Sequence, residues 1–241
     1  CNTGPIAQRV VEEVKNVAKQ GEISFKYKLF THLIRKQNSK NILRYIQLRN
    51  KVKKIVKEEM DRAGAQELLM PSLIPSEYYE KCGRVEAFGA SMFNLKDRYG
   101  KPHVLGPTHE ELFTIAAKTM VRSYKDLPFN LYQQADKFRD EPRPRYGLIR
   151  VREFVMKDAY SFDRDEAGLD VSYQIMKDAY CKIYDRLGID YKIVKADCGA
   201  MGGTLSEEYQ AITDIGEDTI VLCDSCDFSS NLEIAETIVK D

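Results

Sequence analysis

Apolar and polar positions follow two different periods along this chain, and these periods predict where helices and strands form. Residues 6–19 and 42–60 carry apolar side chains three or four positions apart, so each segment predicts one amphipathic helix. Gly21 and Gly64 follow these segments, as expected where a helix ends. The short apolar run at 67–71 predicts a strand that ends at its proline.

The remaining two thirds of the chain read mainly as strands with helices between them. A turn at 97–100 predicts a hairpin of residues 91–95 and 103–105. The other predicted strands are 129–138, 152–161, 189–195, 209–213 and 218–222, and the other predicted helices are 108–122 and 165–187. Strands joined by hairpins, with helices inserted, predict an α+β fold whose mixed sheet is mainly antiparallel and flanked by helices.

Composition excludes several classes of protein. Of 241 residues, 43% are hydrophobic and 10% aromatic, enough for a sizeable core and too many for a disordered linker. No run of about 18 uncharged apolar residues is present, so we expect no transmembrane helix and no membrane partner. The 37 basic residues balance the 37 acidic ones.

That balance hides a segregation of charge. Residues 23–57 hold 11 Lys and Arg and no acid, whereas residues 197–241 hold 11 Asp and Glu and one Lys. The basic segment fits either a contact with nucleic acid or the solvated face of a helix, and charge alone does not separate the two.

The six cysteines, at 1, 82, 181, 198, 223 and 226, are too sparse for a disulfide framework. No secretory segment precedes them, so we expect a cytoplasmic protein. Cys1 stands where Met is expected, which suggests a cut or processed N-terminus. Cys223 and Cys226 form one C-x-x-C pair, but zinc needs two further ligands, so we expect free thiols and no zinc.

The densest cluster of candidate site residues lies around the loop at 140–150. Side chains alternate along a strand, so Arg139 and Glu141 share one face. The even-numbered positions of the returning strand share a face in the same way: Arg150, Arg152, Phe154 and Asp158. Guanidinium groups that fork onto phosphate, a carboxylate that accepts from an amine and a ring that stacks on a base suit a nucleotide. The alternative is a solvent-exposed network of charges.

These residues resemble motif 2 of class II aminoacyl-tRNA synthetases, and the helix and strand that end at Pro71 resemble motif 1. Three further segments, 105–111, 157–162 and 196–203, make the chain similar to prolyl-tRNA synthetases of the bacterial type. The resemblance implies activation of proline by ATP, with Mg²⁺, and transfer to tRNA(Pro). It also implies a homodimer, although segment 37–47 lacks the loop that helps to form it.

The resemblance assigns roles to individual residues. Arg139 would bridge the proline carboxylate and the α-phosphate, Glu141 would face the adenine amine, Phe154 would stack on adenine, and Arg150 would hold the outer phosphates. The proline ammonium would bind Thr108 and Glu110, and the ring and backbone pocket would include Tyr160, Phe162, Gly203 and Glu208. His109 receives no role.

From the residues alone, Thr108 and Glu110 also fit a helix N-terminus, with Thr108 as the cap and acids in the first turn. Tyr160 and Phe162 also fit core aromatics, which is the commoner place for aromatic residues on a strand.

Motif 3, with its ATP-binding arginine, is absent, so we expect an incomplete catalytic domain. Its expected segments are an N-terminal helical part at 1–63, a core with motifs 1 and 2 at 64–200, and the start of an inserted editing region at 201–241. Three functions stay open: part of a longer proline–tRNA ligase, a truncated non-catalytic paralogue that acts as a binding or regulatory module, or a nucleic-acid binder that acts through residues 23–57.

Overall fold

The computed structural model describes residues 39–143, 150–197, 205–213, 216, 218–226 and 228–235. The chain divides into two compact units, one ending at Leu187 and the other beginning at Gly188. The helix predicted at 6–19 and the glycine pair at 202–203 lie outside the described residues. The three segments expected from the motifs stay a prediction.

A three-stranded sheet forms the centre of the first unit, in the order β1 (Gln66–Glu67), β5 (Phe129–Phe138) and β6 (Glu153–Phe162). β5 and β6 are antiparallel and paired along their whole length, from Phe129 opposite Phe162 to Phe138 opposite Glu153, whereas β1 runs parallel to β5. The two long strands confirm the predicted pair.

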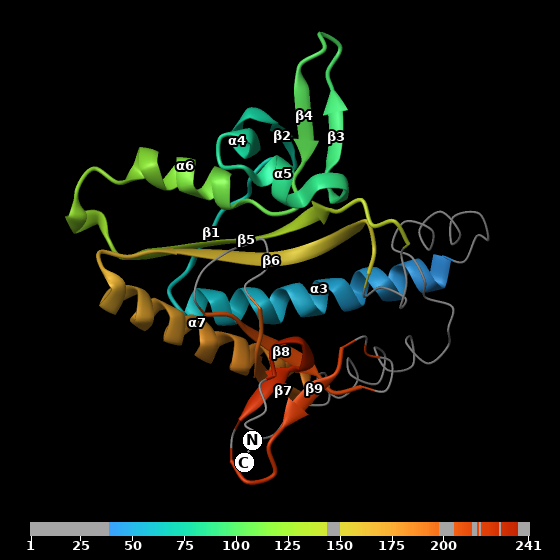
Figure 1. Ribbon diagram of the computed structural model, residues 1–241, viewed down its shortest axis with the longest axis vertical. Helices are drawn as coiled ribbons and strands as arrows, with labels where there is room; N and C mark the ends of the chain where they lie inside the picture. The colour runs from blue at the N-terminus through green and yellow to red at the C-terminus, as the bar shows by residue number, and fades with distance from the viewer. Residues whose placement is uncertain are drawn as a thin grey trace, which may run out of the picture. The chain divides into compact units, whose positions relative to one another are not determined.

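Helices cover both faces of this sheet (Figure 1). α3 (Ser39–Arg62) and α7 (Glu166–Leu187) lie against one face and α6 (Glu110–Met120) against the other. On the α3 face, Gln134 Nε2 donates to the Lys53 carbonyl at 3.1 Å and the Tyr132 hydroxyl donates to Asp61 at 2.8 Å. Because side chains alternate along β5, its even-numbered residues face α3 and its odd-numbered residues face α6.

Helices α3 and α7 confirm the helices predicted at 42–60 and 165–187. α3 ends just before Gly64, whose φ of +80° suits the left-handed residue that follows many helices. Arg186, in the last turn of α7, pairs with Glu58 and Glu59 of α3 and joins the two helices.

The segment predicted as a strand at 67–71 is mostly not one. Only β1 pairs as a strand, and Leu69 is 79% exposed. Leu68 N–H still donates to the Tyr132 carbonyl, but Met70 N–H donates to the Gln133 side chain. The apolar run therefore leaves the sheet before Pro71.

A second sheet, in the order β2 (Leu73–Pro75), β4 (Pro102–Leu105) and β3 (Phe93–Lys96), is antiparallel throughout. Helices α4 (Glu77–Glu80) and α5 (Arg84–Phe88) and the 3₁₀ turn η1 (Gly89–Ser91) connect β2 to β3. A buried apolar cluster joins them: Ile74, Tyr79, Met92 and Val104.

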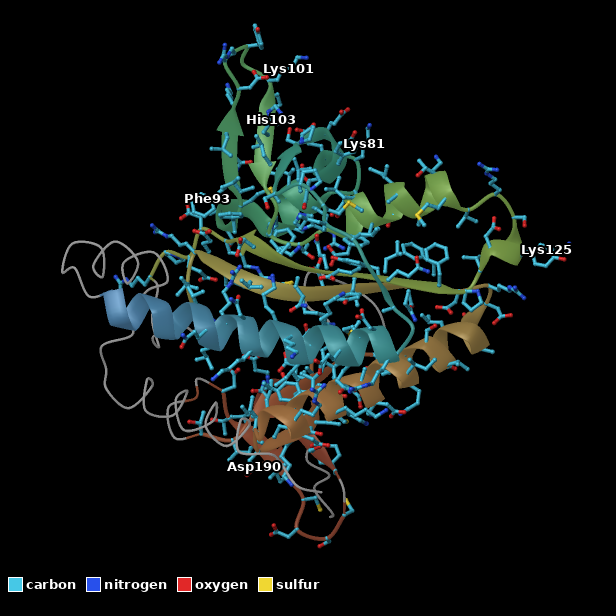
Figure 2. The ribbon with its side chains drawn as sticks, turned by 180° about the vertical axis from the view of Figure 1, so that it is seen from behind. Lys81, Phe93, Lys101, His103, Lys125 and Asp190 are labelled. Carbon is cyan, nitrogen blue, oxygen red and sulfur yellow. The ribbon has the colours of Figure 1, made fainter. Side chains whose placement is uncertain are left out.

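β3 and β4 form the predicted hairpin. Asp97 Oδ1 accepts from the backbone N–H groups of Tyr99 and Lys101 and closes the turn. In Figure 2, Phe93 marks the base of this hairpin and Lys101 lies near its tip. β4 leads into α6, and the 3₁₀ turn η2 (Tyr124–Asp126) then leads to β5.

The second unit is a four-stranded sheet in the order β8 (Glu207–Ala211), β7 (Tyr191–Lys195), β10 (Ser229–Asn231) and β9 (Ile220–Leu222), followed by η4 (Leu232–Ile234). β7–β8 and β9–β10 are antiparallel, and β10 runs parallel to β7. The predicted α+β class with mainly antiparallel sheets is confirmed. Among the described residues, no helix has the length and apolar character needed to cross a membrane.

Candidate active site

The face of the central sheet beneath α6 carries polar side chains at its centre. Odd-numbered residues of β5 and even-numbered residues of β6 point to this face, and their register sets Gln133 opposite Asp158 and Lys137 opposite Phe154. Gln133 and Lys137 are fully buried, and Asp158 is 7% exposed. Buried polar groups that recur on one face indicate a built site rather than an ordinary core.

Thr108 and Glu110 enter this face from the start of α6. The prediction that Thr108 caps the helix is wrong, because His109 is the N-cap residue and no side chain makes a cap hydrogen bond. Thr108 Oγ1 instead donates to Glu110 Oε1 at 2.7 Å, while the Thr108 carbonyl accepts from the Tyr79 hydroxyl at 2.5 Å. The first bond fixes one carboxylate oxygen, and the other, Oε2, is buried without a hydrogen-bond partner.

Arg139 follows the last residue of β5 and lies over Phe154, with its guanidinium carbon 5.4 Å from the ring centroid. Its backbone N–H donates to the Arg152 carbonyl, so the two strands stay paired at this end. Glu141 and Arg150 lie near each other, with Oε2 and Nη1 3.9 Å apart. The structure therefore brings together the four motif 2 residues predicted to bind a nucleotide: Arg139, Glu141, Arg150 and Phe154.

The charges on this face act on one another. Burial lowers the pKa of Arg139, and the Glu141 and Glu110 carboxylates partly oppose that shift. Arg139 Nε is buried without a hydrogen-bond partner, like Glu110 Oε2. A buried donor and a buried acceptor of opposite charge thus remain unpaired on the same face.

Tyr160 and Phe162, the aromatic residues predicted to line the proline pocket, both contact other side chains of the protein. Tyr160 stacks on the buried Phe113 of α6, with ring centroids 4.4 Å apart, and its hydroxyl donates to Asp158 Oδ2 at 2.6 Å. Burial raises the pKa of Tyr160 strongly, so it stays a neutral donor. Phe162 stacks on Phe129 at 5.1 Å. Contact with proline stays a prediction for both.

Two residues of this face received no role from the sequence. His109 is fully buried: its Nε2 lies 3.0 Å from the Pro71 carbonyl and its Nδ1 lies 2.6 Å from Lys137 Nζ. Burial and the Lys137 charge lower the pKa of His109, so the imidazole is neutral. A lysine on an inward-facing position of a buried strand was the signal in the sequence, because such a charge is rarely buried unless paired.

Of the remaining candidates, Gly203 lies outside the described residues. Glu208 lies on β8 in the second unit, where Gln210 donates to its carboxylate at 2.6 Å, and its role stays a prediction.

Cys223 and Cys226 flank the turn between β9 and β10. Backbone N–H groups, first that of Ser225, lower the pKa of Cys223. Across the part of the chain that the structure describes, no group of three or more His, Cys, Asp and Glu side chains is placed to hold a metal ion.

A sequence model for the tRNA synthetase class II core domain (G, H, P, S and T) matches residues 93–241, more than half of the chain. The chain belongs to this class II synthetase core family. The match begins at β3 and includes residues 108–162, which contain every candidate residue of the sheet face described above.

Curated relatives of this class II core are named proline–tRNA ligases. That of Nocardioides sp. is 56% identical over 183 residues, which cover 76% of this chain and 31% of the relative. That of Thermoanaerobacter sp. (strain X514) is 46% identical over 239 residues, which cover 98% of this chain and 42% of the relative. The chain thus spans between about a third and two fifths of the length of these relatives.

Solved structures share the fold. A Giardia lamblia prolyl-tRNA synthetase in complex with prolyl-adenylate superposes with a TM-score of 0.58 at 24% identity, covering 62% of this chain and 32% of that one. A Cryptosporidium parvum prolyl-tRNA synthetase complexed with L-proline and AMP gives 0.56 at 17% identity, covering 66% and 32%. At these identities the likeness concerns the fold alone.

Proposed function

We propose that this class II core is part of a proline–tRNA ligase, which joins proline to ATP as an adenylate and then to tRNA(Pro). One observation carries the proposal: Glu110 Oε2 and Arg139 Nε are buried, oppositely charged and unpaired on the same face. An amino acid brings an ammonium and a carboxylate, one partner for each. The names of relatives at 46–56% identity support proline as that amino acid.

Glu110 would accept from the secondary ammonium of proline through Oε2, since Thr108 already engages Oε1 at 2.7 Å. A charge-assisted bond in a buried site is stronger than a neutral one. Tyr160 and Phe162 would line the apolar ring, and roles for Gly203 and Glu208 in proline binding stay predictions.

Arg139 would contact both the proline carboxylate and the α-phosphate, and its fixed position over Phe154 supports that role. Adenine would stack on Phe154, with Glu141 accepting from its amine and Arg150 contacting the outer phosphates. The nucleophile is already a carboxylate, so no general base is needed. The chain's residues position the two reactants and offset the phosphate charge.

Mg²⁺ would accompany ATP, neutralising phosphate charge, and it usually binds through phosphates with only one or two carboxylates. The described residues offer no cluster of three or more His, Cys, Asp and Glu side chains for a metal ion, so the phosphates of ATP would supply most of its ligands. Dimer formation, tRNA contact and a cytoplasmic location stay predictions.

The test is amino-acid-dependent exchange of pyrophosphate into ATP, measured on the full-length ligase that contains this chain. We expect exchange with proline and none with threonine or serine. Arg139→Ala should abolish it, whereas Arg98→Ala, at the exposed tip of the β3–β4 hairpin, should leave it unchanged. Exchange with threonine or serine but not proline would contradict the proposed specificity.

A further inference from the structure

A fully buried lysine lies at the centre of the candidate active site, two residues before Arg139. Lys137 Nζ is 2.6 Å from His109 Nδ1 and 3.0 Å from Asp158 Oδ2. An ammonium donates to both acceptors at once, and burial lowers the pKa of Lys137 while Asp158 opposes that shift. The proposed chemistry uses none of these three side chains.

These contacts close into a ring. The His109 backbone N–H donates to the Tyr160 hydroxyl at 3.2 Å, and that hydroxyl donates to the same Asp158 Oδ2 that Lys137 binds. Gln133 Nε2 donates to this oxygen as well, at 2.9 Å. A single carboxylate oxygen therefore holds two side chains of β5 and one of β6.

The ring also fixes the orientation of the imidazole. Because His109 Nδ1 accepts from Lys137, its proton is on Nε2, which donates to the Pro71 carbonyl at 3.0 Å. Gly106 packs against the imidazole of His109 so closely that a Cβ at position 106 would lie 2.7 Å from His109 Cε1. Four segments that are far apart in the sequence thus meet at one histidine.

Stability alone does not account for such a cluster. A buried ion pair can often be replaced by apolar residues without loss of stability, because desolvation offsets the attraction between the charges. Its position is more informative: Thr108 and Glu110 flank His109, and Arg139 continues the strand that carries Lys137. The cluster links the two parts of the site that would hold the two ends of the amino acid.

We propose that Lys137 is a positioning residue, which through His109 and Asp158 holds the 106–110 segment in a fixed place relative to Arg139. Lys137 does not touch the substrate. Its contribution is to keep the Glu110 carboxylate at the distance from the Arg139 guanidinium that one amino acid spans. This inference rests on the proposed function for the identity of the ligand, but not for the geometry of the cluster.

The first experiment compares Lys137→Met with Lys157→Met in the full-length ligase. Lys157 is the matched control: it lies on β6 and its Nζ donates to Tyr180 of α7, on the opposite face of the sheet. For Lys137→Met we expect the KM for proline to rise about tenfold or more, with the KM for ATP changed less than about threefold. For Lys157→Met we expect neither KM to change. Equal increases in both KM values for Lys137→Met, or no change in either, would overturn the proposal.

A second pair of variants tests the same link if Lys137→Met does not fold. The Oδ1 atom of asparagine reaches the place of a histidine Nδ1, whereas the glutamine amide reaches that of Nε2. His109→Asn keeps an acceptor for Lys137, and His109→Gln keeps only the donor to Pro71. We expect His109→Asn to retain a near-normal KM for proline and His109→Gln to raise it. The reverse order would show that Pro71, and not Lys137, positions the segment.

Hydrogen exchange of backbone amides, measured without any substrate, separates the two proposals. Lys137→Met should speed exchange in residues 106–110, and Lys157→Met should not. If the wild-type ligase fails to use proline but this difference is present, the substrate is wrong and the positioning role stands. If proline is used but exchange in 106–110 is unchanged, the positioning role is refuted.

Discussion

Replacing Glu110 with glutamine removes one negative charge from the candidate amino-acid site and little else. The amide has nearly the same shape as the carboxylate, and its NH₂ group, at the place of Oε1, can donate to Thr108 Oγ1, now 2.7 Å from Oε1. The amide oxygen then takes the place of Oε2, which is buried without a partner, and offers the ammonium a neutral acceptor. The variant therefore tests the charge on Glu110 rather than its packing.

The size of the effect follows from the kind of hydrogen bond that is lost. A hydrogen bond to a charged group contributes about 1.5–3 kcal/mol and a neutral one about 0.5–1.5 kcal/mol, so the variant loses about 1–2 kcal/mol. At about 1.4 kcal/mol for each factor of ten, kcat/KM for proline should fall about 5- to 30-fold. Because Oε2 is buried, added salt should alter this ratio little.

The assay is proline-dependent pyrophosphate exchange by the full-length ligase, with proline and ATP varied separately. Glu111→Gln is the matched control, since Glu111 is the next residue and its carboxylate pairs with Arg84 Nε at 3.2 Å. We expect that control to lower thermal stability and to leave kcat/KM for proline within about twofold of the wild type. A well-folded Glu110→Gln variant with an unchanged kcat/KM for proline would refute the assignment of the ammonium to Glu110.

Three further predictions concern stability, each followed by urea unfolding. Gly106→Ala sets a Cβ 2.7 Å from His109 Cε1 and should cost about 1–3 kcal/mol, and a smaller cost would mean that the histidine ring moves freely. Phe113→Ala empties a fully buried ring site and should cost about 3–5 kcal/mol. The hydrogen bond from Arg186 lowers the pKa of Glu58 below its ordinary value of 4.5. The pair therefore stabilises the fold fully above pH 4.5, and this stabilisation is lost as the pH falls through the lowered pKa. Arg186→Ala should therefore lower stability at neutral pH and flatten its decline in acid.

The sequence predicted best those elements whose own residues dictate the structure. β5 has the predicted bounds because ten residues in a row alternate between two covered faces. β10 was missed because Ser229 and Ser230 have no strand pattern of their own, and pairing with β7 and β9 imposes it. The apolar run at 67–71 was misinterpreted because apolar character alone does not distinguish a paired strand from an exposed segment such as the one around Leu69.

The candidate site likewise contains residues that the local sequence could place and residues that only tertiary contacts could place. Residues with a recognisable spacing, such as Arg139 and Phe154, could be placed on one face from strand alternation. The roles of His109 and Lys137 could not, because they depend on a contact between residues 28 positions apart. Thr108 was read as a helix cap because its local pattern fits one, and only the tertiary structure shows its hydroxyl bonded to Glu110.

Hydrogen bonding separates binding residues from positioning residues on this face of the sheet. Unpaired buried oxygens also occur at Glu111, Asn130, Asp158 and Asp163, so a missing partner alone does not define a ligand site. Among these atoms of the described residues, Arg139 Nε is the one donor, and Glu110 is a carboxylate on the same face that acts on its charge. Leaving both atoms unsatisfied costs free energy until a ligand carrying both charges binds. Lys137, by contrast, already donates hydrogen bonds to two protein acceptors, His109 Nδ1 and Asp158 Oδ2. In the proposed role it therefore affects substrate binding only through the position of the 106–110 segment.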